Sequence, residues 1–178
     1  MEVEVKFRVT DLEEIERKIS ETAEFVVEKF EYDVYFNHPC RNFAETDEAL
    51  RIRKDSDGFT LTYKGAKIDY ETKTRDEIKV GIDDFEKTKE ILVRLGFRVA
   101  GRVAKRRRIY RRGEIIICLD WIEELGSFVE LEIESGNLNE AKKKIFEYAE
   151  MLGFEAEKSI RKSYLEMILD VAHNNRER

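Results

Sequence analysis

Residues 2–9 read EVEVKFRV, and in this stretch charged and apolar side chains alternate at every position. Side chains in a β-strand point alternately to the two faces of a sheet, so this spacing predicts a strand. The valines and the phenylalanine share its apolar face, and its charged face carries Glu2, Glu4, Lys6 and Arg8. The simplest interpretation of one such strand is an apolar face on the core and a charged face in water.

The alternation recurs in later segments, and this repetition weakens the simple interpretation. An ordinary solvated face also carries Thr, Ser, Asn and Gln, whereas these segments carry nearly pure charge on one face. A sheet that closes with its charged faces inward would enclose a lumen lined by carboxylates and cations. Helices would then cover its apolar exterior. The charged positions are Arg51, Arg53, Lys64, Arg75, Glu77 and Lys79, followed by Glu130, Glu132 and Glu134.

Four other segments have the apolar spacing and the end signals of helices. Thr10-Asp11-Leu12-Glu13 resembles a capping box at the start of the first. Between the helices, Asp57-Gly58 and Arg112-Gly113 indicate hairpin turns. The sequence therefore predicts an α+β fold, an antiparallel meander of about eight strands with helices packed outside. The expected helices run from Thr10 to about Thr22, from Asp83-Asp84 to a C-terminal Gly96, from Asn137 or Asn139 to Leu152, and from 159–163 onward.

The tripeptide Leu-Gly-Phe follows two of these predicted helices, at 95–97 and again at 152–154. A basic, aromatic stretch comes after each copy. We interpret this recurrence as a hint of internal pseudo-symmetry.

Composition excludes several classes of protein. The chain has 178 residues, enough for one domain, and 42% of them are hydrophobic, which excludes a disordered chain. Cys40 and Cys118 have no metal-binding spacing, and His38 and His173 are the two histidines, so zinc ribbons, disulfide scaffolds and histidine triads are excluded. A net charge of −6 argues against a nucleic-acid binder. The basic run 105–112, taken alone, is more simply a solvated strand than a nucleic-acid patch.

Two expectations concern the protein's surroundings. No apolar run reaches the roughly 18 residues of a membrane helix, and residues 1–7 lack a signal-peptide core, so we expect a soluble cytoplasmic protein. Charged residues make up 40% of the chain, which is typical of a heat-adapted source, although few prolines are present.

An inward charged face is costly unless a polyanion and a metal fill it. Two glutamates at i and i+2 on a strand face lie about 7 Å apart, near enough to share a hydrated divalent ion. With no suitable His or Cys, the ligands are oxygens, which favours Mg²⁺ or Mn²⁺. Lysine and arginine suit phosphate oxygens. The pattern indicates metal-assisted phosphoryl transfer.

These residues resemble the CYTH domain of the triphosphate tunnel metalloenzymes, whose hallmark Glu-x-Glu-x-Lys occurs as Glu2, Glu4 and Lys6. The resemblance runs from Met1 to about Leu169, and its branch of class IV adenylyl cyclases shares the stretches 35–39 and 46–49. The family also includes thiamine triphosphatases. Further matching motifs are Leu-Arg-Ile-Arg at 50–53, Leu-Thr-Tyr-Lys-Gly at 61–65, Lys-x-Arg at 105–107, Leu119-Asp120, and Leu-Gly-x-Phe-x-Glu-x-Glu at 125–132.

The resemblance implies an eight-stranded antiparallel β-barrel, a tunnel that binds triphosphate compounds with divalent metal. It implies one CYTH domain over residues 1–170 and a polar tail over 171–178. The family's middle Arg-x-Glu often continues with an acid where this chain has Lys79. The implied metal ligands are Glu2, Glu4, Glu77, Asp120, Glu130 and Glu132. The implied triphosphate-binding residues are Lys6, Arg51, Arg53, Lys64, Arg75, Lys105 and Arg107, of which Lys6, Arg53, Lys64, Lys105 and Arg107 are the expected catalytic set.

Three functions remain open. In the first, the ribose 3′-hydroxyl of ATP attacks the α-phosphorus, which yields cyclic AMP and pyrophosphate. In the second, water attacks the terminal phosphoryl group of tripolyphosphate, thiamine triphosphate or a nucleoside triphosphate. The third is a non-enzymatic module that binds polyphosphate or RNA, which the paired glutamates disfavour because they would repel a polyanion. The branch resemblance favours the cyclase. A homodimer is left open.

Overall fold

The computed structural model describes residues 2–68, 71–72 and 74–174. By internal contacts the chain divides into two compact units. Unit 1 comprises Met1–Lys29, Ile68–Arg75 and Arg106–Arg161, and unit 2 comprises Phe30–Lys67, Asp76–Lys105 and Lys162–Arg178.

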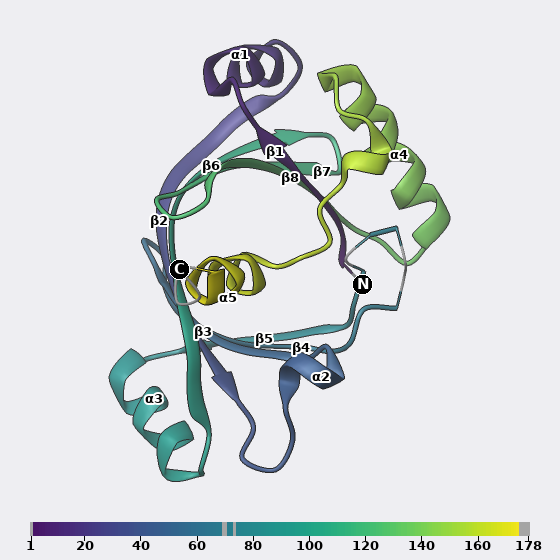
Figure 1. Cartoon of the computed structure of the whole chain (residues 1–178). Helices are drawn as coiled ribbons and strands as arrows, with labels where there is room; N and C mark the ends of the chain where they lie inside the picture. The colour runs from purple at the N-terminus through teal and green to yellow at the C-terminus, as the bar shows by residue number, and fades with distance from the viewer. Residues whose placement is uncertain (1, 69–70, 73, 175–178) are drawn as a thin grey trace. The chain divides into compact units, whose positions relative to one another are not determined.

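Eight strands form one sheet in the order β1-β8-β7-β6-β2-β3-β4-β5 (Figure 1). The runs β2 to β5 and β6 to β8 follow sequence order, as in a meander, but the first strand pairs with the last. The predicted α+β class and its eight antiparallel strands are confirmed. The strands are β1 (Glu2–Val9), β2 (Glu24–Asn37), β3 (Ala49–Asp55), β4 (Gly58–Lys64), β5 (Glu77–Ile82), β6 (Arg98–Arg112), β7 (Ile115–Ile122) and β8 (Gly126–Glu134).

The helices begin and end close to the predicted positions. The first cap lies one residue later than predicted, because the Asp11 carboxylate, and not the Thr10 hydroxyl, accepts the free N–H of Glu14 at 3.0 Å. In the last helix Ser163 and Glu166 cap each other's backbone N–H groups. The helices are α1 (Leu12–Thr22), α2 (Phe43–Thr46), α3 (Phe85–Arg94), α4 (Leu138–Leu152) and α5 (Tyr164–Asn174), with a 3₁₀ turn, η1 (Ala156–Lys158).

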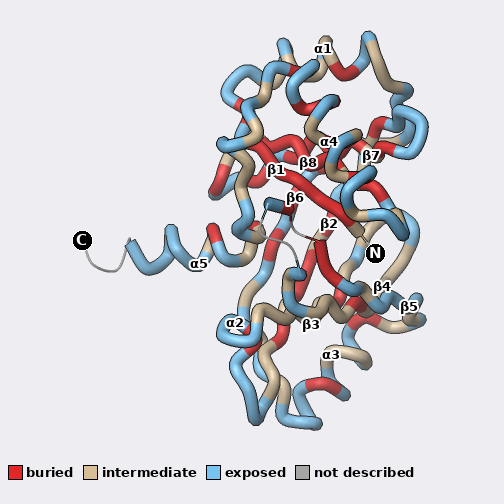
Figure 2. Tube along the Cα trace, turned by 90° about the vertical axis from the view of Figure 1, so that its right-hand side faces the viewer, coloured by how far each residue is buried: buried red, intermediate tan, exposed pale blue. Residues whose placement is uncertain are grey.

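The core of unit 1 lies between the apolar face of its strands and helix α4. Val5, Phe7 and Leu131 are at most 2% exposed, and Ile145 of α4 packs into the same cluster. Figure 2 shows buried residues along β1 and β8. Each such side chain stabilises the fold by roughly 1.5–3 kcal/mol when fully buried. Because this face of β1 packs on the core, the alternation turns its charged residues to the other face.

The core of unit 2 is smaller and has the same arrangement. Ile52 of β3 and Phe36 of β2 pack against Phe85 and Leu92 of α3. The apolar face of β3 is therefore covered, and Arg51 and Arg53, which alternate with Ile52, lie on its opposite face.

The two Leu-Gly-Phe tripeptides are explained by a shared helix end. Gly96 and Gly153 both have φ of +94°, a conformation that favours glycine. After each glycine the phenylalanine N–H donates to a carbonyl of the last helical turn, from Phe97 to Leu92 and from Phe154 to Ala149. The repeat therefore marks two Schellman caps.

Among the described residues, every helix is too short or too polar to span a bilayer. Of the predicted polar tail, residues 171–174 complete α5, and residues 175–178 lie outside the described residues.

Candidate active site

The charged face of unit 1 is buried, so the interpretation of a solvated face does not hold there. Lys6 is 1% exposed, Asp120 is 0% and Glu130 is 5%. Burying so many ionised groups is unfavourable unless they are paired or bind a ligand. We call this set the acidic cluster; it comprises Glu4, Lys6, Arg107, Asp120, Glu130 and Glu132.

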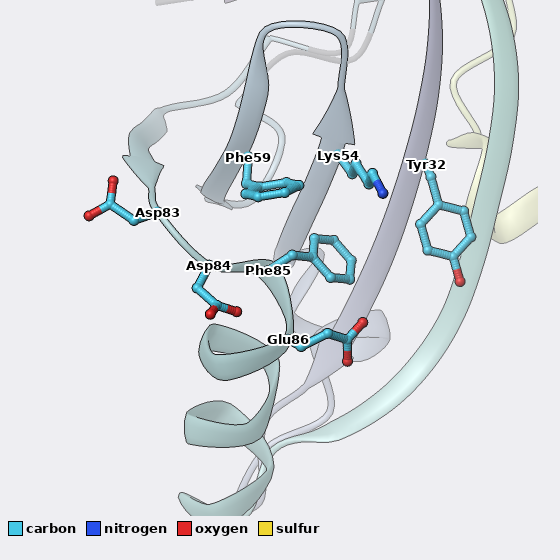
Figure 3. A pocket seen from close by; sticks show the side chains of 7 residues that line it. All are labelled: Tyr32, Lys54, Phe59, Asp83, Asp84, Phe85 and Glu86. Atoms are coloured by element: carbon cyan, nitrogen blue, oxygen red, sulfur yellow. The ribbon is translucent and has the colours of Figure 1, made fainter.

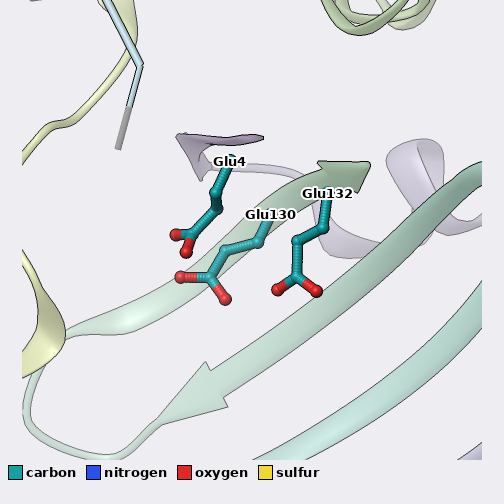
Figure 4. Close-up of side chains that lie close together, drawn as sticks. All are labelled: Glu4, Glu130 and Glu132. Atoms are coloured by element: carbon teal, nitrogen blue, oxygen red, sulfur yellow. The ribbon is translucent and has the colours of Figure 1, made fainter. Parts of the chain in front are cut away.

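Three glutamates of the acidic cluster converge. Strand pairing places Glu4 of β1 opposite Glu132 of β8, with Glu130 two positions along β8. Figure 4 shows the three side chains extending to the same side of these strands. One carboxylate oxygen from each lies within 4.8 Å of the others. This is the ligand type that Mg²⁺ and Mn²⁺ prefer.

Two cations of the acidic cluster are held by its carboxylates. The Lys6 ammonium lies 3.1 Å from a Glu130 oxygen. Arg107 donates from Nε and Nη2 to the two oxygens of Asp120, both at 2.6 Å, and it also donates to Glu130. This forked pair fixes the plane of the guanidinium. Asp120 therefore orients Arg107. It does not belong to the group of three converging carboxylates.

The electrostatics of Glu132 show that the glutamates repel one another. Burial raises the pKa of its carboxyl, and the nearby charges of Glu2, Glu4 and Glu130 raise it further. Arg107, whose Nη1 is 3.8 Å away, opposes these effects only in part. The pKa of Glu132 is about 8, so at neutral pH this site holds a proton that a divalent cation could replace.

Unit 2 carries a second buried set of charges, which we call the basic cluster. Arg53 donates from Nε and Nη2 to the two oxygens of Asp33, at 2.7 and 2.8 Å. Burial opposes ionisation of Asp33, but the charges of Arg51, Arg53 and Lys105 outweigh it and hold its pKa well below the usual range. The basic cluster comprises Glu31, Asp33, Arg51, Arg53, Lys64, Glu77 and Lys105.

Further ion pairs position the other cations of the basic cluster. Glu31 lies 2.9 Å from Arg53 and 3.2 Å from the Lys105 ammonium. The Lys105 ammonium also lies over the Tyr164 ring, 5.1 Å from its centre. Lys64 pairs with Glu77 at 2.8 Å.

Each of the five cations predicted as catalytic thus has a carboxylate partner, and each is positioned before any ligand binds. The pairs are Lys6–Glu130, Arg53–Asp33, Lys64–Glu77, Lys105–Glu31 and Arg107–Asp120.

Strand pairing places three more of the predicted site residues. Arg75 is 8% exposed and forms an isolated β-bridge with Glu2 in unit 1. Glu2 itself lies opposite Glu134 in the strand register. Glu77 belongs to unit 2, where its partner is Lys64.

Sequence reasoning missed Glu31 and Asp33, which are 3% and 1% exposed. They alternate with Tyr32 and Val34, which is the same period of two that revealed the other strands. The signal was therefore present, but without the strand register nothing linked these acids to arginines 20 residues away.

Buried donors in and beside the basic cluster can bind an oxyanion. Arg51 Nε is buried and has no hydrogen-bond partner among the described residues, and the same holds for the hydroxyls of Thr60 and Thr62. In unit 1 the three glutamates, with a carboxyl that keeps its proton at neutral pH, fit a divalent cation. The residues present therefore suit both a metal ion and a phosphate.

A pocket of about 400 Å³ lies elsewhere in unit 2, at the start of α3 (Figure 3). Tyr32, Lys54 and Phe59 line it, and each alternates along its strand with a residue of the opposite, charged face. The pocket is therefore on the other side of the strands from Asp33 and Arg53.

Cys118 lies beside the acidic cluster, opposite Glu130 in the register. It is 1% exposed, and burial raises the pKa of its thiol well above the usual value. Cys40 is exposed, and both cysteines are free.

Comparison with known proteins gives a consistent picture. A family model described as the CYTH domain matches residues 1–164. The chain is 42% identical over 171 residues to a Methanocaldococcus jannaschii protein named "Putative adenylate cyclase MJ0240", covering 94% of this chain and 98% of that protein. It is also 42% identical to the solved PH1819 protein of Pyrococcus horikoshii, with a TM-score of 0.89, over 96% of this chain and 99% of that one.

A more distant solved structure shares the fold alone. It is a Hippeastrum protein named "Putative adenylyl cyclase HpAC1" and described as having a dominant triphosphatase activity. Its sequence is 17% identical, its TM-score is 0.66, and the match covers 97% of this chain and 96% of that one.

Proposed function

Because this chain belongs to the CYTH domain family, whose members act on triphosphates, we propose that it is a metal-dependent adenylyl cyclase that converts ATP to cyclic AMP and pyrophosphate. The branch resemblance and the name of the Methanocaldococcus relative support the cyclase assignment. We include in the same proposal that residues 1–170 act as one domain.

One observation carries the proposal: Glu4, Glu130 and Glu132 converge in a buried site beside two positioned cations. Here the pKa of Glu132 stays near 8 despite Arg107, so the set carries more negative charge than its partners neutralise. A divalent cation supplies the missing charge.

The metal ligands in this proposal are Glu4, Glu130 and Glu132, with Glu2 beside them. When bound, Mg²⁺ or Mn²⁺ would polarise a phosphoryl oxygen and neutralise charge that develops on it. The other proposed metal-side acids keep a different role, since Asp120 orients Arg107 and Glu77 orients Lys64.

The cations bind and orient the triphosphate. Arg53 and Arg107, whose planes are fixed by forked carboxylate pairs, present their remaining N–H groups to phosphoryl oxygens. Lys6, Lys64 and Lys105 act as point charges, and Arg51 and Arg75 complete the binding set. Positioning and charge neutralisation supply most of the catalysis in phosphoryl transfer.

Hydrolysis of tripolyphosphate, thiamine triphosphate or a nucleoside triphosphate is the second candidate. The same carboxylates and cations serve it, and the two reactions differ in which phosphorus is held in line with the nucleophile. The activity described for the Hippeastrum protein favours keeping this candidate, since the fold does not determine the reaction.

The test is to incubate the pure protein with Mg²⁺ or Mn²⁺ and either ATP or tripolyphosphate, and to identify the products by phosphorus NMR. Cyclic AMP with pyrophosphate supports the cyclase. Orthophosphate identifies a triphosphatase. If neither substrate gives a product, the proposal of an enzyme is refuted, and the module that binds polyphosphate becomes the favoured function. Glu4→Gln should abolish turnover, whereas Glu147→Gln, on the exposed side of α4, should not.

A further inference from the structure

Three buried donor groups of unit 2 lack a hydrogen-bond partner among the described residues: Arg51 Nε, Thr60 Oγ1 and Thr62 Oγ1. A buried donor without an acceptor is destabilising, and native proteins leave few of them. Thr62 is 1% exposed, so bulk water does not satisfy its hydroxyl. Three such atoms on adjacent strands call for a common explanation.

The strand register places these atoms on one face. Thr62 of β4 lies opposite Arg51 of β3, and Thr60 lies opposite Arg53. Residues directly opposite in an antiparallel pair have neighbouring side chains. The three donors therefore line one strip of β3 and β4, on the face that carries the basic cluster.

The side chains directly opposite Thr62 in the strand register offer only hydrogen-bond donors. Its register neighbours are Arg51 on β3 and Lys79 on β5, and Lys64 follows two residues along the same face. Arginine and lysine side chains are donors only. Arg51 pairs with Asp33 through Nη1, at 3.6 Å, and its Nε has no hydrogen-bond partner among the described residues. The Glu77 carboxylate, which acts on the charge of Arg51, pairs with Lys64 at 2.8 Å and does not bond to these three donors.

We infer that Thr60, Thr62 and Arg51 Nε form an oxyanion subsite that binds the non-bridging oxygens of one phosphoryl group. The inference rests on the proposed function and adds two residues to it. The threonine hydroxyls donate to the phosphoryl oxygens, and the neighbouring Lys79 adds positive charge. Gly81, opposite Thr60, leaves open space where another residue would place a Cβ, so no β5 side chain fills the position beside Thr60.

The first test needs no ligand. Thr62→Val keeps the shape and removes the hydroxyl, so it should raise the melting temperature of the protein in EDTA by about 2–4 °C. Thr72→Val is the matched control, because Thr72 is also 1% exposed but its hydroxyl bonds to Thr74 at 2.6 Å. That control should lower the melting temperature. An unchanged or lower value for Thr62→Val would mean that an ordered water satisfies Thr62, and would overturn the inference.

The second test measures binding of tripolyphosphate by calorimetry in EDTA, where metal-dependent turnover is absent. Thr62→Val should weaken binding about 10- to 100-fold, and Thr62→Ser, which keeps the hydroxyl, should stay within about threefold of the wild type. Thr60→Val provides a second variant if Thr62→Val does not fold. Equal affinity of the wild type and Thr62→Val would overturn the inference and leave the proposed function intact. A wild type that binds no tripolyphosphate, with or without Mg²⁺, would overturn the proposed function as well.

Discussion

Replacing Glu132 by glutamine distinguishes the stability that the protein loses through the acidic cluster from the role of that cluster in binding a metal ion. In the metal-free protein, the pKa of Glu132 is raised from its ordinary 4.5 to about 8. The folded protein therefore keeps a proton that the unfolded chain loses. Stability should fall as the pH rises from about 4.5 to about 8 and then level off. Glu132→Gln removes the titrating group, so its stability should not show this fall.

The size of the effect follows from the same pKa. A change from 4.5 to about 8 corresponds to roughly 5 kcal/mol of lost stability above pH 8, because each tenfold change in proton affinity is worth about 1.4 kcal/mol. The Glu132 side chain is 22% exposed, and solvent there weakens the repulsion. We expect about 2 kcal/mol at pH 8.5, or about 4–8 °C in melting temperature for a chain of this length.

The assay is thermal unfolding of both proteins between pH 5 and pH 9 in EDTA, repeated with excess Mg²⁺. Without metal, Glu132→Gln should melt higher than the wild type at pH 8.5, and the difference should vanish near pH 5. With Mg²⁺ the order should reverse, because the wild type gains a bound ion and the variant lacks one carboxylate ligand. Parallel curves at all pH values would refute the claim that Glu132 is destabilised by its neighbours. An unchanged wild type in Mg²⁺ would refute the metal site.

Three other predictions concern the same clusters. Glu4→Gln should abolish turnover while the protein stays folded, as judged by circular dichroism, and Glu130→Gln should also lose several kcal/mol of stability because the buried Lys6 and Arg107 lose the charge of Glu130. Saturating Mg²⁺ with tripolyphosphate should raise the melting temperature by about 5–10 °C at a hundredfold excess over Kd, and an unchanged curve would argue against a formed site. Asp33→Asn should destabilise the protein by about 3–5 kcal/mol at pH 7, because Arg53 loses its forked partner. The depressed pKa of Asp33 means that this loss should shrink as the pH falls below about 4, because the unfolded wild-type chain then takes up a proton that the folded carboxyl does not, which denaturant unfolding at several pH values would measure.

The local sequence determined where helices and strands form and which side chains share a face of a strand. Alternation in residues 2–9 predicted that Glu4 and Lys6 share a face, and β1 has this arrangement. Caps such as Asp84 and Asn137 were readable because a helix start needs a nearby side-chain acceptor, which is a contact over a few residues.

Long-range partners were decided by the tertiary structure. Asp120 resembled a metal-side acid, but the register of β6 and β7 sets it opposite Arg107, and there it holds the guanidinium. Glu31 and Asp33 joined the basic cluster for the same reason, since Asp33 and Arg53 are directly opposite across β2 and β3.

The chain by itself therefore determined which side chains share a face, because strand geometry sets the direction of every second residue. It did not determine whether Thr62 has an acceptor, or which carboxylate neutralises which cation. Those depend on strand register and burial, which arise only when segments far apart in sequence pair. The free energy of an ion pair or an unpaired hydroxyl depends on how fully that pairing excludes water.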